Sequence, residues 1–212
     1  MQKSLEELSK LEKVSPGDYS FGKSIEDFEN IILGYFYFRS QREIEESGLT
    51  ERPFAGIEAM EESMIMLVDG PPEGKELTNY KSLSASGIMA NIPSLAEKTS
   101  HFAYFNNDPD VDGSIRWVSL VKIFNGNLYP SLSLKLAAES MNSFILVSID
   151  DVGVSSIEFI DKETEESKLK IPVDPNGQGR MLIKHRGPKF TFPQISMADA
   201  YDGNFTKDQL NL

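Results

Sequence analysis

The chain has 212 residues, a net charge of −12 and no cysteine. This acidity argues against binding to nucleic acid or to an anionic membrane surface, because both attract clustered Lys and Arg. The lack of cysteine excludes disulfides, thiolate nucleophiles and Cys-based metal sites. The longest apolar run, residues 31–38, is far shorter than the roughly 20 residues of a membrane helix. We therefore expect a soluble chain, with any membrane anchors of a parent protein lying outside it.

The first 29 residues predict two short helices. The second begins with Asp18 as its cap and places Phe21, Ile25 and Phe28 at helical spacing. We therefore expect a helical N-terminal part, with these three side chains as the apolar face of its second helix.

A strand and a charged helix follow. Residues 31–38 (IILGYFYF) contain no alternating polar residue, which is typical of a strand buried on both faces. The charged segment 39–48 predicts a short solvated helix. The pattern of residues 58–68 fits a helix as well as a strand, and residues 77–91 are too weakly patterned to place firmly. Pro93 then predicts the first turn of a short helix.

The middle of the chain has the most regular pattern. Strands are predicted over residues 102–105 and 115–124. Asn125 and Gly126 favour a tight turn after the second strand, because both residues tolerate positive φ. A helix is predicted to start at Pro130, with apolar residues at i, i+3, i+4 and i+7 spacing.

The C-terminal part predicts further strands and one helix. Residues 144–149 and 181–185 are predicted strands, and residues 157–160 and 169–173 flank a charged segment typical of a hairpin tip. Ser196 has capping-box-like spacing for a last short helix.

These elements predict an α/β fold of the mixed α+β type, with a central mixed β-sheet flanked by helices and extended by β-hairpins. We expect a single domain over residues 1–212. Within it, a helical part spans residues 1–29, a sheet-rich core spans 30–193, and a short helix and tail span 194–212.

Residues Gly17 to Ser24 match the phosphate-loop pattern GxxxxGKS, with Lys23 at the lysine position. Such a loop needs a buried strand directly before it, and the preceding letters LEKVSP do not form one. A soluble nucleotide-binding enzyme is therefore the alternative function, and a helix that already contains Phe21 is the alternative structure. A continuous helix over residues 18–28 would exclude nucleotide binding.

Asp108, Asp110 and Asp112 precede Gly113 at the spacing of the first half of a calcium-binding loop. The twelfth position of that loop, which should be a bidentate Glu, is Ser119. Calcium is therefore the one cofactor that the sequence offers. The alternative is a tight acidic turn between two strands, which Asp and Gly also favour.

Short motifs follow one another in a fixed order between Asp18 and Gly203. They are Phe105-Asn106, Pro109-Asp110-x-Asp112-Gly113-x-Ile115-Arg116, Leu128-Tyr129-Pro130-Ser131-Leu132, Ile171-Pro172-Val173-Asp174, Gly179-Arg180, Arg186-Gly187-Pro188 and Phe192-Pro193-x-Ile195-Ser196-x-x-Asp199. No single motif is specific, but their series resembles the second CHASE family, the cyclases/histidine kinases associated sensory extracellular domains.

The chain departs from this family at both ends. The family's first strand, with an Ile-Asp pair and a Trp-Pro segment, has no counterpart here, and neither has its last strand, which ends in Val-Gly before membrane helices. Trp117 stands where the family more often has a basic or polar residue. The resemblance therefore implies a fragment of the family's domain.

The resemblance implies a non-catalytic, extracytoplasmic sensory domain of a bacterial signalling enzyme that is anchored in the membrane. Its output domain is expected to be an adenylate cyclase; a histidine kinase, a diguanylate cyclase or a serine/threonine kinase is the alternative. The expected partner is an unidentified small molecule or periplasmic signal, with a homodimer as a further expectation and no nucleic acid.

The candidate ligand-binding residues are Arg116, Trp117, Arg180 and Arg186. Trp117 beside Arg116 is suited to stack a ligand, although a lone Trp in a strand also serves in core or edge packing. The observation that would best test this assignment is whether a closed, partly polar pocket exists near Arg116, Trp117 and Arg180. We expect no catalytic residue.

Overall fold

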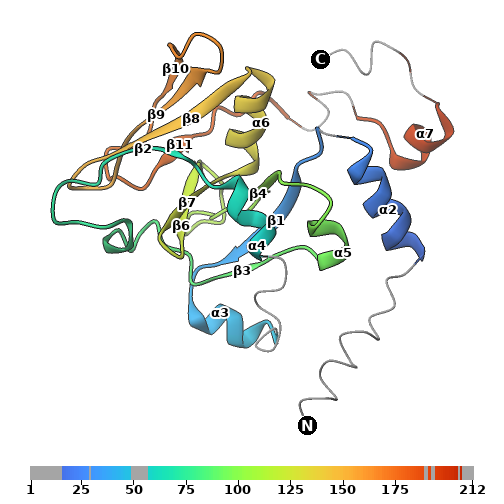
Figure 1. Ribbon diagram of the computed structural model, residues 1–212, viewed down its shortest axis with the longest axis horizontal. Helices are drawn as coiled ribbons and strands as arrows, with labels where there is room; N and C mark the ends of the chain where they lie inside the picture. Colours follow the sequence, from blue (N-terminus) through green and yellow to red (C-terminus); the bar gives the residue numbers. More distant parts are fainter. Residues whose placement is uncertain are drawn as a thin grey trace. The chain divides into compact units, whose positions relative to one another are not determined.

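The computed structural model describes residues 16–28, 30–48, 57–188, 191, 194–204 and 206 (Figure 1). The chain divides into two compact units, Met1–Leu182 and Ile183–Leu212, and each is described by itself. Helices and mixed sheets together confirm the predicted α+β class, with the strands distributed over four small sheets. The first predicted helix lies outside the described residues.

The helices are α2 (Pro16–Glu26), α3 (Gln41–Glu46), α4 (Ile57–Met60), α5 (Pro93–Ala96), α6 (Leu132–Ser140) and α7 (Met197–Asp202), with 3-10 turns η1 (Glu61–Ser63) and η2 (Leu77–Asn79). The strands are β1 (Leu33–Phe38), β2 (Leu67–Asp69), β3 (Gly87–Met89), β4 (Phe102–Tyr104), β5 (Trp117–Ser119), β6 (Val121–Phe124), β7 (Asn127–Pro130), β8 (Ser143–Ile149), β9 (Val154–Asp161), β10 (Ser167–Ile171) and β11 (Arg180–Leu182).

The first sheet is built around β1, in the order β3-β1-β4, with β3 antiparallel and β4 parallel to it. The predicted strand is present, but it is fully buried only at alternate positions and at its end, so the predicted burial on both faces holds in part. Buried residues of this strand and of the elements around it form one cluster. We call it the aromatic core and define it as Ile25, Leu33, Tyr35, Tyr37, Met60, Ile88, Ala96, Phe102, Tyr104, Phe124 and Tyr129. Helices α2 and α5 pack against each other beside this sheet (Figure 1).

The second sheet has the order β10-β9-β8-β2, in which the long hairpin of β8 and β9 is central and β2 is parallel to β8. Helix α6 packs on β8. Together with β6 and β7 they enclose the aliphatic core, defined as Ile65, Tyr80, Leu83, Leu120, Val121, Ile123, Leu128, Leu134, Ala138, Val147, Ile149, Val154, Ile157, Phe159 and Ile171.

Strands β5 and β6 connect these regions. The sequence predicts one strand over residues 115–124, but the chain changes partner at Leu120, whose N–H donates to the carbonyl of Gly179 at 2.9 Å. Before this point β5 pairs with β11, and after it β6 pairs with β7. The turn between β6 and β7 has Asn125 at φ 48° and Gly126 at φ 78°, which confirms the predicted tight turn.

Some local predictions are wrong. Asp18 is not the cap of the second helix, because α2 begins at Pro16 and contains Asp18 in its first turn. Of the predicted apolar face only Ile25 is buried, next to Gly22, whereas Phe21 and Phe28 are 52% and 61% exposed. Pro130 ends β7, where Val121 is its partner, and it does not start the helix. Helix α6 begins two residues later, at Leu132, because Ser131 is its N-cap and accepts a hydrogen bond from the N–H of Leu134.

The unit Ile183–Leu212 contains helix α7. Ser196 is its N-cap and accepts a hydrogen bond from the N–H of Asp199, and Gly203 ends the helix in the left-handed conformation, at φ 71°. The predicted last helix is therefore confirmed. The N-cap Ser pattern identifies its start and the Gly identifies its end.

Candidate functional site: a cationic cavity

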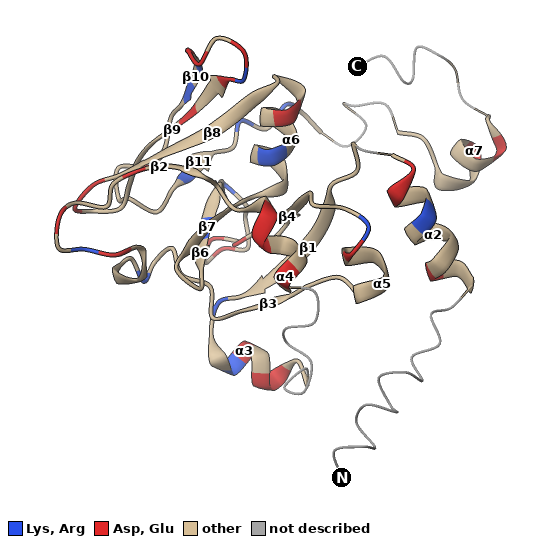
Figure 2. Ribbon diagram, viewed as in Figure 1, with Lys and Arg blue, Asp and Glu red and all other residues tan. Residues whose placement is uncertain are grey.

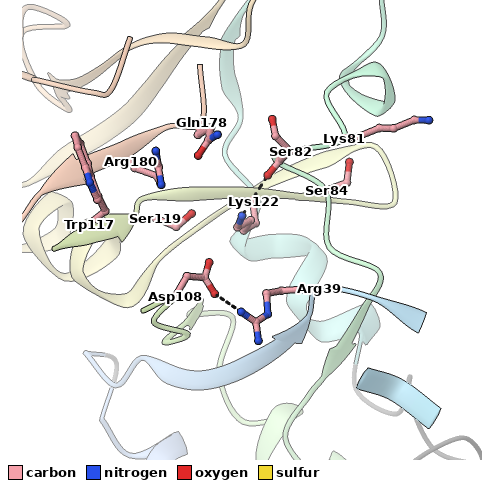
Figure 3. Close-up of a pocket in the computed structure, with 10 residues that line it drawn as sticks. All are labelled: Arg39, Lys81, Ser82, Ser84, Asp108, Trp117, Ser119, Lys122, Gln178 and Arg180. Atoms are coloured by element: carbon pink, nitrogen blue, oxygen red, sulfur yellow. Dashed lines mark hydrogen bonds and ion pairs between the residues drawn. The ribbon is translucent and has the colours of Figure 1, made fainter. Parts of the chain in front are cut away.

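A cavity of about 330 Å³ opens in the unit Met1–Leu182, among residues that are far apart in the sequence (Figure 3). Its lining residues are Arg39, Lys81, Ser82, Ser84, Asp108, Trp117, Ser119, Lys122, Gln178 and Arg180. Four of these side chains are cationic and one is a carboxylate, although the whole chain carries a net charge of −12. The cavity therefore has the opposite local charge balance to the chain that forms it.

Arg180 is the first residue of β11 and is held by the loop before it. The N–H of Asp174 donates to the carbonyl of Arg180 at 2.8 Å, and the N–H of Arg180 donates to the carboxylate of Asp174 at 2.9 Å. The guanidinium lies 5.1 Å from the ring centre of Trp117 and 3.4 Å from the buried Asp174 carboxylate, measured from Nη2. Its Nε atom is buried and has no hydrogen-bond partner in the described part of the chain.

Lys122 projects into the cavity from β6, between the buried residues Val121 and Ile123. Its Nζ atom lies 5.3 Å from the ring centre of Tyr37 and 3.5 Å from the carbonyl oxygen of Ser82. Burial lowers the pKa of this amine, and the nearby charges of Arg39 and Arg180 lower it further, while Asp108 opposes them. Within the described residues Lys122 forms no ion pair.

Arg39 and Asp108 form the remaining charged wall (Figure 3). Arg39 directly follows β1 and pairs with Glu43 at 2.8 Å and with Asp108 at 3.3 Å. Asp108 also accepts a hydrogen bond from the Tyr37 hydroxyl at 3.0 Å. Burial and the neighbouring Asp108 raise the pKa of Tyr37, so this hydroxyl keeps its proton and remains a donor.

Asn106 positions the segment that carries Asp108. This buried side chain accepts from the N–H of Tyr37 and donates to the carbonyl of the same residue, both at 2.9 Å. It therefore continues the pairing of β1 on the side of β4, whose own pairing ends at Tyr35, while β3 pairs with the other edge. Asp108 follows two residues later and is brought to the cavity by this attachment.

Of the four predicted ligand-binding residues, the structure brings Trp117 and Arg180 together in the cavity. Arg116 does not line it, because its guanidinium pairs with Asp110 at 2.8 Å and Asp112 at 2.7 Å. Arg186 belongs to the unit Ile183–Leu212. The cavity beside Trp117 and Arg180 is partly polar and open to solvent, and binding of a ligand by these two residues stays a prediction.

The three aspartates of the predicted calcium loop are divided between two arginines. Asp110 and Asp112 face Arg116, whereas Asp108 faces Arg39. The segment forms a tight turn in which the N–H of Gly113 donates to the carbonyl of Asp110, which is the alternative that the sequence offers. The described residues contain no group of three acidic or histidine side chains placed to hold a metal ion. Calcium binding stays a prediction, and it would require these ion pairs to break.

The predicted phosphate loop is wrong. Residues Gly17 to Ser24 all lie inside helix α2, so their backbone amides are part of a helix and cannot surround a phosphate as a loop. Gly22 serves the packing of α2 on α5 instead, because a Cβ atom there would lie 2.9 Å from the carbonyl oxygen of Ser94. This geometry removes the basis for a nucleotide-binding enzyme.

The sequence did not identify Arg39, Lys81, Lys122 and Gln178 as cavity residues. Two of them carry a signal that could have been used. Lys122 is the one charged residue in the apolar run VKIF, and Arg39 is the first charge after the buried strand β1. A charge in such a place must reach solvent, a partner or a cavity.

Comparison with known proteins gives one match. The family model of the CHASE2 domain matches residues 5–211. No curated protein and no solved structure shows significant similarity to the chain. Within the described part, no helix is both long and apolar enough to cross a bilayer. Because the match covers nearly the whole sequence, the chain belongs to the CHASE2 family of extracellular sensory domains of signalling proteins.

Proposed function

We propose that this chain is the extracytoplasmic signal-input domain of a bacterial signalling enzyme that is anchored in the membrane, with an adenylate cyclase as its output domain. The family match over residues 5–211 is the observation that carries this proposal. The chain senses and does not catalyse: the binding of a small-molecule signal controls the formation of cyclic AMP by the parent protein. A dimer of two such chains is the arrangement we expect for the parent protein.

The signal binds in the cationic cavity. Arg39 belongs to the end of β1, the central strand of the aromatic core, whereas Lys122 and Arg180 stand next to residues of the aliphatic core. A ligand that contacts all three side chains contacts both cores. It would favour the arrangement of the cores in which these contacts are made, and thereby shift the balance between two conformations of the domain.

The experiment is a topology and activity measurement on the full parent protein. Reporter fusions on either side of the region that encodes this chain are expected to place it outside the cytoplasmic membrane, between or beside hydrophobic spans. Membranes that contain the parent protein are expected to form cyclic AMP. A gene without membrane spans and without an output domain would contradict the proposal, and cyclic di-GMP formation or autophosphorylation would replace the cyclase by another output.

A further inference from the structure

We propose that the cavity recognises a small organic anion through Arg180 and Lys122, and that Asp108 is the internal carboxylate which competes with this anion for the cationic groups. The inference rests on the proposed sensory function and names the chemical class of its signal. Three observations on the described residues support it independently. Arg180 has a donor without a partner there, Lys122 has no counter-ion there, and one carboxylate, Asp108, lines the cavity.

The guanidinium of Arg180 has a hydrogen-bond donor that no described residue accepts from. Its Nε is buried without a partner, and the guanidinium reaches Asp174 only through Nη2, at 3.4 Å. A buried donor without a partner costs free energy, because its hydrogen bond to water is lost and not replaced. The flat guanidinium fork matches the two oxygens of a carboxylate or phosphate, so an anion in the cavity is the partner that would satisfy this donor.

Lys122 places a second positive charge in the same cavity. The amine is half-buried, and Arg39 and Arg180 lie close enough to lower its pKa. Figure 3 shows Lys81, the fourth cation, extending away from these groups. Three cations that repel one another are stabilised when an anion enters between them. Binding of the anion is therefore expected to raise the pKa of Lys122.

Asp108 is the one carboxylate that lines the cavity, and both of its oxygens already have partners. One accepts from Tyr37 and the other faces Arg39. An anion held by Arg180 and Lys122 would be repelled by Asp108 and would compete with it for Arg39. Neutralising Asp108 should then tighten the binding of the anion, whereas neutralising Lys122 should weaken it.

The size of the cavity limits the signal to a small molecule. A volume of about 330 Å³ corresponds to about ten water molecules at the density of the liquid, which is at the small end of ligand sites. Trp117 provides an aromatic wall beside the guanidinium of Arg180. The signal therefore combines one or two anionic groups with a short carbon skeleton.

The experiment uses Trp117, the only tryptophan of the chain, as its reporter. The purified 212-residue chain is titrated at low salt with inorganic phosphate and, separately, with succinate, and the tryptophan fluorescence is recorded; succinamide is the uncharged control. A saturable change with at least one anion is expected, weakening as salt is added, and none with succinamide. A response to phosphate alone or to succinate alone identifies the anionic group.

The variants give effects of opposite sign. Lys122→Met should weaken binding by about tenfold or more, and Asp108→Asn should strengthen it about threefold or more. Arg116→Gln is the matched control, because this arginine does not line the cavity. The affinity of this variant for the anion should equal that of the native chain. Arg180→Gln leaves the buried Asp174 without its partner, so the double variant Asp174→Asn, Arg180→Gln is also measured and should lose binding about tenfold or more.

The inference is overturned if the native chain responds to neither anion, or if Lys122→Met binds as tightly as the native chain. Either result would remove the anion as signal and leave the topology and cyclic AMP measurements on the parent protein unaffected. Conversely, a parent protein without membrane spans would contradict the sensory function while the anion titration still stood.

Discussion

The aromatic core around β1 and the aliphatic core around β8 and β9 hold the two sides of the cavity by different means. In the aromatic core, Tyr37 and Tyr104 meet edge to face, with ring centres 5.1 Å apart. The hydroxyl of Tyr37 donates to the carboxylate of Asp108 at 3.0 Å, and the hydroxyl of Tyr104 donates to the carbonyl of Ser119 at 3.0 Å. This core therefore positions polar groups of the cavity directly.

The aliphatic core positions its side of the cavity through the backbone. Lys122 faces the cavity because Val121 and Ile123 on either side of it face the core. Arg180 follows Gly179, where a Cβ atom would lie 2.9 Å from a methyl group of Val121, so the loop fits closely against this core. The wall beside the aromatic core therefore depends on specific hydrogen bonds, whereas the wall beside the aliphatic core depends on apolar packing.

The largest effect is expected from a cavity in the aliphatic core. Phe159 is 1% exposed, and Phe159→Ala should lower the free energy of unfolding by about 3–5 kcal/mol, because it removes buried apolar area and leaves a void. Urea unfolding measures the change. Phe159→Leu, which keeps most of the volume, should lose distinctly less, and a cost for the Ala variant below about 1 kcal/mol would contradict a wall held by packing.

A smaller effect is expected where the aromatic core relies on hydrogen bonds. Asn106→Ala leaves the N–H and the carbonyl of Tyr37 without their side-chain partner, which should cost about 2–4 kcal/mol in urea unfolding. The neighbouring Asn107 is exposed, so Asn107→Ala is the control and should change stability by less than about 0.5 kcal/mol. Equal stability of the two variants would show that Asn106 does not hold this wall.

Elements whose pattern is local could be predicted from the sequence. Three elements are predicted correctly from a few neighbouring residues each. They are the strand β1 from its apolar run, the turn at Asn125-Gly126, and the helix start at Ser196. The break at Leu120 could not be predicted, because it depends on pairing with Gly179, which is remote in the sequence. Phe21 was predicted to be buried because of its helical spacing, but it is exposed. The spacing does not determine which side of a helix packs against the rest of the protein.

Only part of the site could be predicted in the same way, since two of the four predicted ligand-binding residues line the cavity. Trp117 and Arg180 were identified, Arg180 as part of a motif of the family series, and they do line the cavity. Arg39 and Lys122 were missed, since a charge at the end of a strand or within it is usually solvated. Only the pairing of the strands places them opposite Asp108. Arg116 was chosen because it adjoins Trp117, but residues next to each other in an extended chain point to opposite sides.

The smallest effect concerns two ion pairs, Asp112 with Arg116 and Asp161 with Lys168. Asp112 beside Arg116 and Asp161 beside Lys168 each have a pKa lowered to about 2. Arg116 is the largest cause of the lowering at Asp112, followed by the N–H of Ser114, which donates at 3.0 Å. Lys168 is the largest cause at Asp161, which also accepts from two N–H groups, those of Glu163 and Thr164, at 2.7 and 3.0 Å. In the folded state both carboxylates are therefore ionised below the pH at which they would protonate in the unfolded chain.

Replacing the cation of each pair should change the pKa values of the two carboxylates to different extents. In Arg116→Gln the pKa of Asp112 should rise from about 2 towards the ordinary value near 3.8, because its largest cause is lost and one backbone donor, Ser114, remains. In Lys168→Met the pKa of Asp161 should rise less, because two backbone donors remain. Because folding lowers these pKa values, each pair stabilises the protein above about pH 4 and loses that contribution as the pH falls towards 2. Carboxyl titration by NMR of the native chain and both variants measures these values. An Asp112 pKa that remains near 2 in Arg116→Gln would show that the turn itself, and not the arginine, holds this carboxylate ionised.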